Sequence, residues 1–213
     1  MKLAPYFILP VILCLTSCQD QASSNQAATD TTAAVQTPEP QSLDSTYLII
    51  PGEGIGKVNV GMPGEELTAA LGDPDSTDAA MGKALLYWLS EDTAQPRHFL
   101  AIYTESDFGS DHPQPIVKQL QVTSPQFKTP DNISTGTSLS EIREHYPHLE
   151  PLAYYQNGAQ QQVYIFDAQP EGIAFEVTLP DSILTAITVH EKGKDVSGNY
   201  LPLHPGMTLL KQP

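Results

Sequence analysis

Two histidines stand close enough in the sequence to share a metal ion. His145 and His148 are three residues apart, and on an uninterrupted helix both imidazoles would lie on one face. Pro147 lies between them and ends a helix, because proline lacks the backbone N–H that the next turn needs. The other histidines lie far away in the sequence, so we expect neither a metal site nor a cofactor.

A cluster of acidic residues imitates part of a calcium loop. Glu105, Asp107 and Asp111, together with Gly109, have alternate carboxylates that can converge on a hard cation. The remaining ligands do not follow in the usual order. A solvated loop between two strands is therefore the favoured interpretation.

Signatures of catalysis are weak. The glycine run over residues 52–56 is not followed by the Lys-Ser/Thr pair of a phosphate loop, which favours a turn that leads the chain into its first strand. No Gly-x-Ser-x-Gly elbow occurs, and paired carboxylates are what 25 acidic residues give by composition. We expect a protein that is not an enzyme, and a hydrolase with an unrecognised carboxylate site is the least favoured alternative.

Aromatic residues on or beside the expected strands are the better candidates for binding. Neighbours such as Tyr87 and Trp88 must point to opposite faces of a sheet, so we expect one ring of such a pair in the core and the other exposed. Exposed Tyr and Trp side chains are common anchors for proteins or sugars. The candidate binding surface consists of Tyr87, Trp88, Tyr154, Tyr155 and Tyr164.

The N-terminus reads as an export signal over residues 1–17. Lys2 supplies a positive end, and an apolar run over residues 3–15 follows, which is shorter than the roughly 20 residues that span a bilayer. Residues 15–18, Leu-Thr-Ser-Cys, resemble the lipobox of bacterial lipoproteins. That resemblance implies cleavage before Cys18, acylation of its thiol, and attachment to a membrane through the acyl chains. Gln19, being other than Asp, is compatible with sorting to the outer membrane.

Residues 18–46 are predicted to be a lipidated flexible tether. They are rich in Gln, Ala, Ser, Thr, Asp and Pro, and they hold too few bulky apolar residues to form a core. Such a segment would hold the following domain roughly 30 Å from the bilayer. The formal net charge of −15 and the absence of any Lys or Arg run exclude nucleic acid as a partner.

The rest of the chain contains an internal repeat, which predicts one unit over residues 47–125 and a second over residues 126–213. Gly61 and Gly136 each join a short apolar segment to the start of a helix. Ser138 begins an S-x-x-E capping box, while Pro63 suits the first position of the earlier helix.

After each expected helix the apolar period changes from 3.6 to 2, which indicates antiparallel strands. The sequence therefore predicts an α+β fold of two tandem units, each a short helix packed on a three- to four-stranded antiparallel sheet. The expected strands are Leu85–Leu89, Phe99–Tyr103, Ile116–Val122, Val163–Phe166, Ile173–Val177 and Ile183–His190.

Residues 60–67 (VGMPGEEL) and 71–74 (LGDP) resemble the helix starts and ends in the beta-lactamase inhibitory protein and in the small lipoprotein of the outer-membrane barrel-assembly machine. Residues 127–129 (FKT) and 135–142 (TGTSLSEI) are also similar to uncharacterised tandem lipoproteins. The resemblance implies a module that binds proteins or peptidoglycan-associated partners and does not catalyse. Pro63 departs from the Ser or Thr that these motifs often carry.

The sequence thus favours an envelope lipoprotein that acts as a non-catalytic protein-interaction module. The alternative is a surface lipoprotein that binds glycan through its aromatic residues. The identity of the partner is left open.

Replacing Cys18 by Ser should abolish fatty-acid labelling and release the protein from membranes, because the thiol is the site of acylation. Labelling with a radioactive fatty acid, followed by membrane fractionation, tests this. A labelled Cys18→Ser protein would show that the anchor lies elsewhere or is absent.

Overall fold

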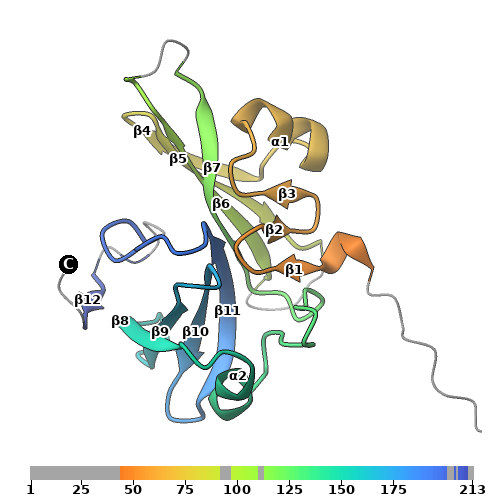
Figure 1. Ribbon diagram of the computed structural model, residues 1–213. Coiled ribbons are helices and arrows are strands. Elements are labelled where there is room, and N and C mark those ends of the chain that lie inside the picture. Colours follow the sequence, from red (N-terminus) through yellow and green to blue (C-terminus); the bar gives the residue numbers. More distant parts are fainter. Residues whose placement is uncertain (1–43, 92–96, 110–112, 201–203, 205, 211–213) are drawn as a thin grey trace, which may run out of the picture. The chain divides into compact units, whose positions relative to one another are not determined.

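The fold is α+β, as the sequence predicts. A computed structural model describes residues 44–91, 97–109, 113–200, 204 and 206–210 (Figure 1). Cys18, the export signal and the tether as far as residue 43 lie outside the described residues, so their predicted roles remain predictions. Neither α-helix in the described part is long and apolar enough to cross a membrane. The described elements are η1 (Ser45–Tyr47), β1 (Ile49–Ile50), β2 (Gly54–Ile55), β3 (Val58–Asn59), α1 (Gly64–Leu71), β4 (Ser76–Ala80), β5 (Lys83–Leu89), β6 (Phe99–Ser106), β7 (Pro115–Val122), α2 (Leu139–His145), β8 (Glu150–Gln156), β9 (Gln162–Ala168), β10 (Ile173–Thr178), β11 (Ile183–His190) and β12 (Thr208–Leu209).

The described strands form a nine-stranded antiparallel sheet and a small three-stranded one. The order in the large sheet is β12-β8-β9-β10-β11-β7-β6-β5-β4, and the small sheet holds β1, β2 and β3. Each helix is followed along the chain by four strands that form a meander, β4 to β7 after α1 and β8 to β11 after α2 (Figure 1). The last strands of the two meanders, β7 and β11, pair with each other, so both meanders belong to one continuous sheet.

The turn before each helix is hydrogen-bonded to the last strand of the meander that follows that helix. The backbone N–H of Gly61 donates to the carbonyl of Val117 in β7 over 2.8 Å. In the same way, the N–H of Gly136 donates to the carbonyl of Leu184 in β11 over 2.8 Å. Each helix therefore begins beside the strand that joins the two meanders.

One face of the large sheet carries the main core. Leu67 of α1 and Ile142 of α2 are buried against apolar side chains of that face, as are Ile49 and Ile55 of the small sheet. Because successive strand side chains alternate between faces, the same strands present a second set of residues to the other side. The helices and the small sheet therefore cover one face only.

The other face is covered in part by the chain that follows β11. Val196, Tyr200, Met207 and Leu209 pack there against a second apolar cluster that includes Ala174 of β10. β12 lies within this C-terminal segment and pairs with β8. This segment therefore runs over the sheet face that carries no helix.

The expected elements agree closely with the structure where apolar periodicity is strong. α1 and α2 begin and end within about a residue of the predicted signals, and all six expected strands are present. The expected series of strands was nevertheless incomplete, because each meander begins with a strand that was not predicted. All five residues of β4 are exposed, so it shows no apolar alternation, and β8 contains Pro151, a residue that weakens a strand prediction.

Replacing Gly61 or Gly136 by Ala should lower the free energy of unfolding by about 1 to 3 kcal/mol each. Their φ angles are +86° and +96°, and an added Cβ would meet nothing within 4 Å, so the cost is one of backbone conformation. Gly158→Ala is the matched control, because its Cβ also meets nothing and its φ is not in the left-handed region. Urea denaturation measures all three variants. Equal stability of the three would contradict the role assigned to these two turns.

Candidate functional site

A hollow of about 1160 Å³ lies on the face of the large sheet opposite the helices. Its floor comes from three neighbouring strands, with Gln121 on β7, Ala186 on β11 and Glu176 on β10. Glu176 and Ala186 are direct cross-strand partners, and Gln121 pairs with Thr188 of β11. The register of β7, β11 and β10 therefore places a carboxylate beside a side-chain amide at the centre of the sheet.

Aromatic rings form the walls of this hollow. Tyr155 of β8 is stacked on His204 of the C-terminal segment, with centroids 3.7 Å apart and planes inclined by 15°. On the other side, Tyr87 and Phe99 make an edge-to-face contact at 5.7 Å. Such ring pairs hold each other in place, so the walls are fixed on two opposite sides.

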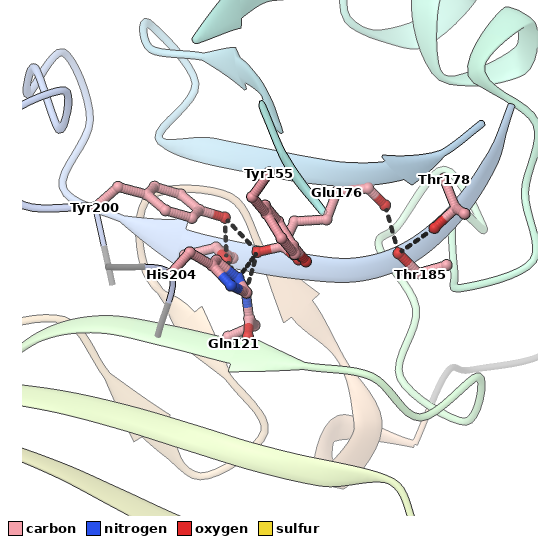
Figure 2. A network of polar contacts seen from close by, with 8 residues as sticks. Gln121, Tyr155, Glu176, Thr178, Thr185, Tyr200 and His204 are labelled. Atoms are coloured by element: carbon pink, nitrogen blue, oxygen red, sulfur yellow. Dashed lines mark hydrogen bonds and ion pairs between the residues drawn. The ribbon is translucent and has the colours of Figure 1, made fainter. Parts of the chain in front are cut away.

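Four donors surround the carboxylate of Glu176 (Figure 2). Its Oε1 accepts from Gln121 Nε2 at 2.7 Å and from the Tyr200 hydroxyl at 3.3 Å, and His204 Nε2 lies 3.2 Å away. Its Oε2 accepts from the Tyr155 hydroxyl at 2.6 Å. Glu176 is only 3% exposed, so these contacts replace the water that a carboxylate would otherwise bind.

Thr188 extends the network to the strand between Gln121 and Glu176. Its hydroxyl lies 3.1 Å from Gln121 Nε2 and 2.8 Å from the Tyr200 hydroxyl. Gln121, Thr188 and Tyr200 are all buried. The floor of the hollow is therefore a closed hydrogen-bonded network. It is built from β10 and β11 of the second meander, β7 of the first meander, and the C-terminal segment that carries Tyr200.

The electrostatics of the network keep Glu176 ionised. Burial raises the pKa of the carboxyl, but hydrogen bonds from His204, Tyr155 and Gln121, with the charge on His204, outweigh burial and lower the pKa below its ordinary 4.5. Burial and the neighbouring Glu176 charge raise the pKa of the Tyr155 and Tyr200 hydroxyls. At neutral pH both tyrosines are therefore donors, and Glu176 is an acceptor with no proton to give.

The first predicted aromatic pair divides between the two faces. Tyr87 lines the hollow, whereas Trp88 packs toward the helix-side core and donates from Nε1 to the carbonyl of Gly72 at 3.3 Å. The predicted alternation is therefore present. Trp88 packs against the core, and both rings are half-buried, so neither ring of the pair is fully exposed.

The remaining predicted residues are also distributed over both faces. Tyr155 lines the hollow, while Tyr164 packs toward the helix-side core. Tyr154 is the cross-strand partner of Tyr164, with ring centroids 5.7 Å apart, and it borders the hollow as well. The five candidates do not form one surface, and their role in binding remains a prediction.

Sequence reasoning missed the residue at the centre of the site. Glu176 stands in the apolar run Ile-Ala-Phe-Glu-Val over residues 173–177, where a charged side chain must find buried partners. That interruption was a usable signal. Gln121, Tyr200 and His204 gave none, because only the sheet register and the return of the C-terminal segment bring them to Glu176.

The other chemistry considered from the sequence is dispersed. His145 faces Asp131 at 3.9 Å and His148 faces Glu171 at 3.1 Å, so the two imidazoles have different partners. Glu105 forms an ion pair with Lys83 at 3.4 Å, and Asp111 lies outside the described residues. Within the described part, no three His, Cys, Asp or Glu side chains are grouped so that they could hold a metal ion.

A buried His–Asp pair makes all of its contacts within the fold. His190 Nε2 lies 2.9 Å from Asp167 Oδ1, and His190 Nδ1 lies 3.0 Å from the carbonyl of Glu191. Both ring nitrogens thus face acceptors, and the ring is 1% exposed. The pair leaves no nitrogen for a ligand or substrate.

Comparisons with known proteins give little about identity. The chain matches no known protein family and no curated protein. A structural search finds the crystal structure of a DUF4309 family protein, YjgB, from Bacillus subtilis. It is 9% identical, with a TM-score of 0.39 over 66% of this chain and 88% of that one.

Replacing Glu176 by Gln should lower the free energy of unfolding at pH 7 by about 3 kcal/mol, because the amide loses the charge and turns an NH2 donor toward a donor that one carboxylate oxygen now accepts from. A lowered folded pKa means that the contribution of Glu176 is complete above pH 4.5 and is lost as the pH falls through the folded pKa.

Denaturant unfolding of wild type and Glu176→Gln between pH 3 and 7 measures this difference, which should narrow below pH 4.5. Glu191→Gln, at an exposed position, is the matched control and should stay close to wild type throughout. A difference that is constant with pH would show that Glu176 is not the ionised acceptor described here.

Proposed function

We propose that this protein is a lipid-anchored envelope lipoprotein that acts as a non-catalytic interaction module and binds its partner in the hollow above Glu176. The anchor rests on the lipobox-like residues 15–18 at the end of an export signal. Cys18 is the cysteine that remains after cleavage, because Cys14 belongs to the signal. The outer membrane is the favoured location.

The observation that carries the binding role is the hollow itself. It has aromatic walls, a floor fixed by hydrogen bonds, and a volume slightly above the roughly 300–1,000 Å³ of ordinary ligand sites. A surface with these properties is prepared for a partner, because its side chains need little reordering on binding.

The same floor argues against hydrolysis. Hydrolysis by a pair of carboxylates needs one as acid and one as base, and Glu176 is the sole acidic residue among the described residues that line the hollow. Its lowered pKa leaves no proton to donate, and its oxygens are taken by four donors. This arrangement favours a positioning role for Glu176.

We also propose that residues 47–125 and 126–213 are two copies of one helix-plus-meander module. The mutual hydrogen bonds between loop and strand support this proposal. Val117 N–H donates to Met62 O at 2.9 Å, and Leu184 N–H donates to Thr137 O at 2.9 Å, each next to the glycine contact of its own half. In addition, isolated bridges join Pro63 to Ile116 and Ser138 to Ile183.

Each of the two proposed copies also contains a register shift in the sheet, at the corresponding strand pair. The register of β6 with β7 shifts after Tyr103, and the register of β10 with β11 shifts after Glu176. Aligning the shifts makes Gln121 the counterpart of Thr188, and these two residues are direct partners across the β7–β11 pair. A two-fold axis between two copies would pass through this pair, at the floor of the hollow.

The partner expected from the sequence is another envelope protein, within reach of a domain that its tether holds roughly 30 Å from the membrane. A surface glycan is the second candidate. The chemistry of the hollow favours it, because uncharged polar and aromatic side chains predominate in the lining.

A photo-crosslinking residue such as benzoylphenylalanine at Gln156, which is exposed and lines the hollow, should yield a covalent adduct in intact cells. The same residue at Thr68, exposed on α1, should not. Gel mobility and mass spectrometry of the purified chain detect the adduct. Adducts at Thr68 alone, or at neither position, would reject the hollow as the binding site.

A further inference from the structure

The rim of the hollow carries polar groups that the fold does not use. Within the described part of the chain, the Tyr87 hydroxyl, the His98 ring and the side chains of Gln156 and Thr208 have no hydrogen-bond partner. The phenol, amide and hydroxyl can each donate and accept, and a neutral imidazole does both through its two nitrogens. Ligand hydroxyl groups have the same double capacity.

The residues that line the hollow carry little net charge, so the hollow does not favour a charged ligand. Arg97, Glu176 and the His204 that faces Glu176 are the residues of its lining that contribute charge. The Arg97 guanidinium already donates to the carbonyl of Ser90, and Glu176 is enclosed by its four donors. In a chain of net charge −15, this lining is nearly neutral, so the ligand it fits is uncharged.

The floor of the hollow offers no place for peptide binding by strand addition. The strands from β5 to β11 are each paired on both sides in the sheet, whereas β12, which carries Thr208, is an edge strand at the rim. An extended peptide therefore finds no unpaired backbone edge on the floor. The ring faces of Tyr87 and Phe99 instead offer flat apolar surfaces next to the unused polar groups.

We propose that the hollow binds a neutral oligosaccharide, with the C–H faces of its rings on the aromatic walls and its hydroxyls on Tyr87, His98, Gln156 and Thr208. This assignment rests on the proposed function, since it names the ligand class of the same site. The volume of about 1160 Å³ provides room for more than one sugar ring.

The test uses the full lipidated chain, purified in a detergent without a sugar head group. It is applied to an array of neutral tetrasaccharides of glucose, mannose, galactose, xylose and N-acetylglucosamine, with oligogalacturonate as the acidic comparison. Isothermal titration then measures the strongest interaction. Saturable binding of at least one neutral tetrasaccharide, tighter than that of oligogalacturonate, is expected.

Two variants with matched controls locate the binding. Tyr87→Phe and Gln156→Ala remove groups that make no internal hydrogen bond, so each should keep the fold and weaken binding about three- to tenfold. Tyr47→Phe, exposed in η1, and Gln114→Ala, also exposed and outside the hollow, should leave binding unchanged. Equal affinity of all four variants would overturn the proposal.

The outcomes separate the ligand class from the site. A protein adduct at Gln156, together with no neutral tetrasaccharide bound by the folded chain, would reject the oligosaccharide and retain the hollow as the interaction site. Tighter binding of oligogalacturonate would likewise reject the neutral class. The absence of both an adduct and any bound saccharide would reject the site as well.

Discussion

The pairing of β7 with β11 governs both the fold and the site. Four cross-strand pairs, from Ile187 with Val122 to His190 with Gln119, join two meanders that are each complete in sequence before they meet. Without this pairing each meander would end in an open edge, which is a hazard for aggregation. The same pairing brings Gln121 beside Thr188 and within 2.7 Å of Glu176. The sheet and the floor of the hollow therefore depend on one set of backbone hydrogen bonds.

Helix ends and strands could be predicted from the sequence where a single residue type or a simple alternation determines the local conformation. Ser138 caps α2 by accepting from the Glu141 N–H. β11 occupies the predicted residues 183–190, where Ile187 and Val189 of the helix-side core alternate with Thr188 and His190. The opposite orientation of Tyr87 and Trp88 also followed from alternation. β4 was missed because an exposed strand of small and polar residues has no periodic signal, although pairing with β5 determines its conformation.

The candidate site was harder to predict, because its members are distant in sequence and ordinary in type. Glu176 and His204 are 28 residues apart, and Gln121 and Glu176 are 55 apart. A glutamine in a strand that alternates polar and apolar residues reads as an exposed side chain, yet Gln121 is buried because the C-terminal segment crosses the second face. The apolar run around Glu176 was the one local indication, since a lone carboxylate in such a strand requires partners.

In the proposed duplication, the position of Glu176 can be compared with the equivalent position in the other copy, which shows whether folding alone requires a carboxylate there. On the alignment of the two register shifts, its counterpart is Tyr103, a buried ring in the second apolar cluster. A buried carboxylate rarely adds stability over a well-packed apolar side chain, so folding alone favours a buried ring, as at Tyr103, over a carboxylate. Tyr200 and His204, two of the four donors around Glu176, come from the chain after β11, which crosses the face of the hollow. The carboxylate and the segment that encloses it therefore hold Tyr155, Gln121 and His204 in place at the hollow, an arrangement that serves the proposed binding role and has no counterpart around Tyr103.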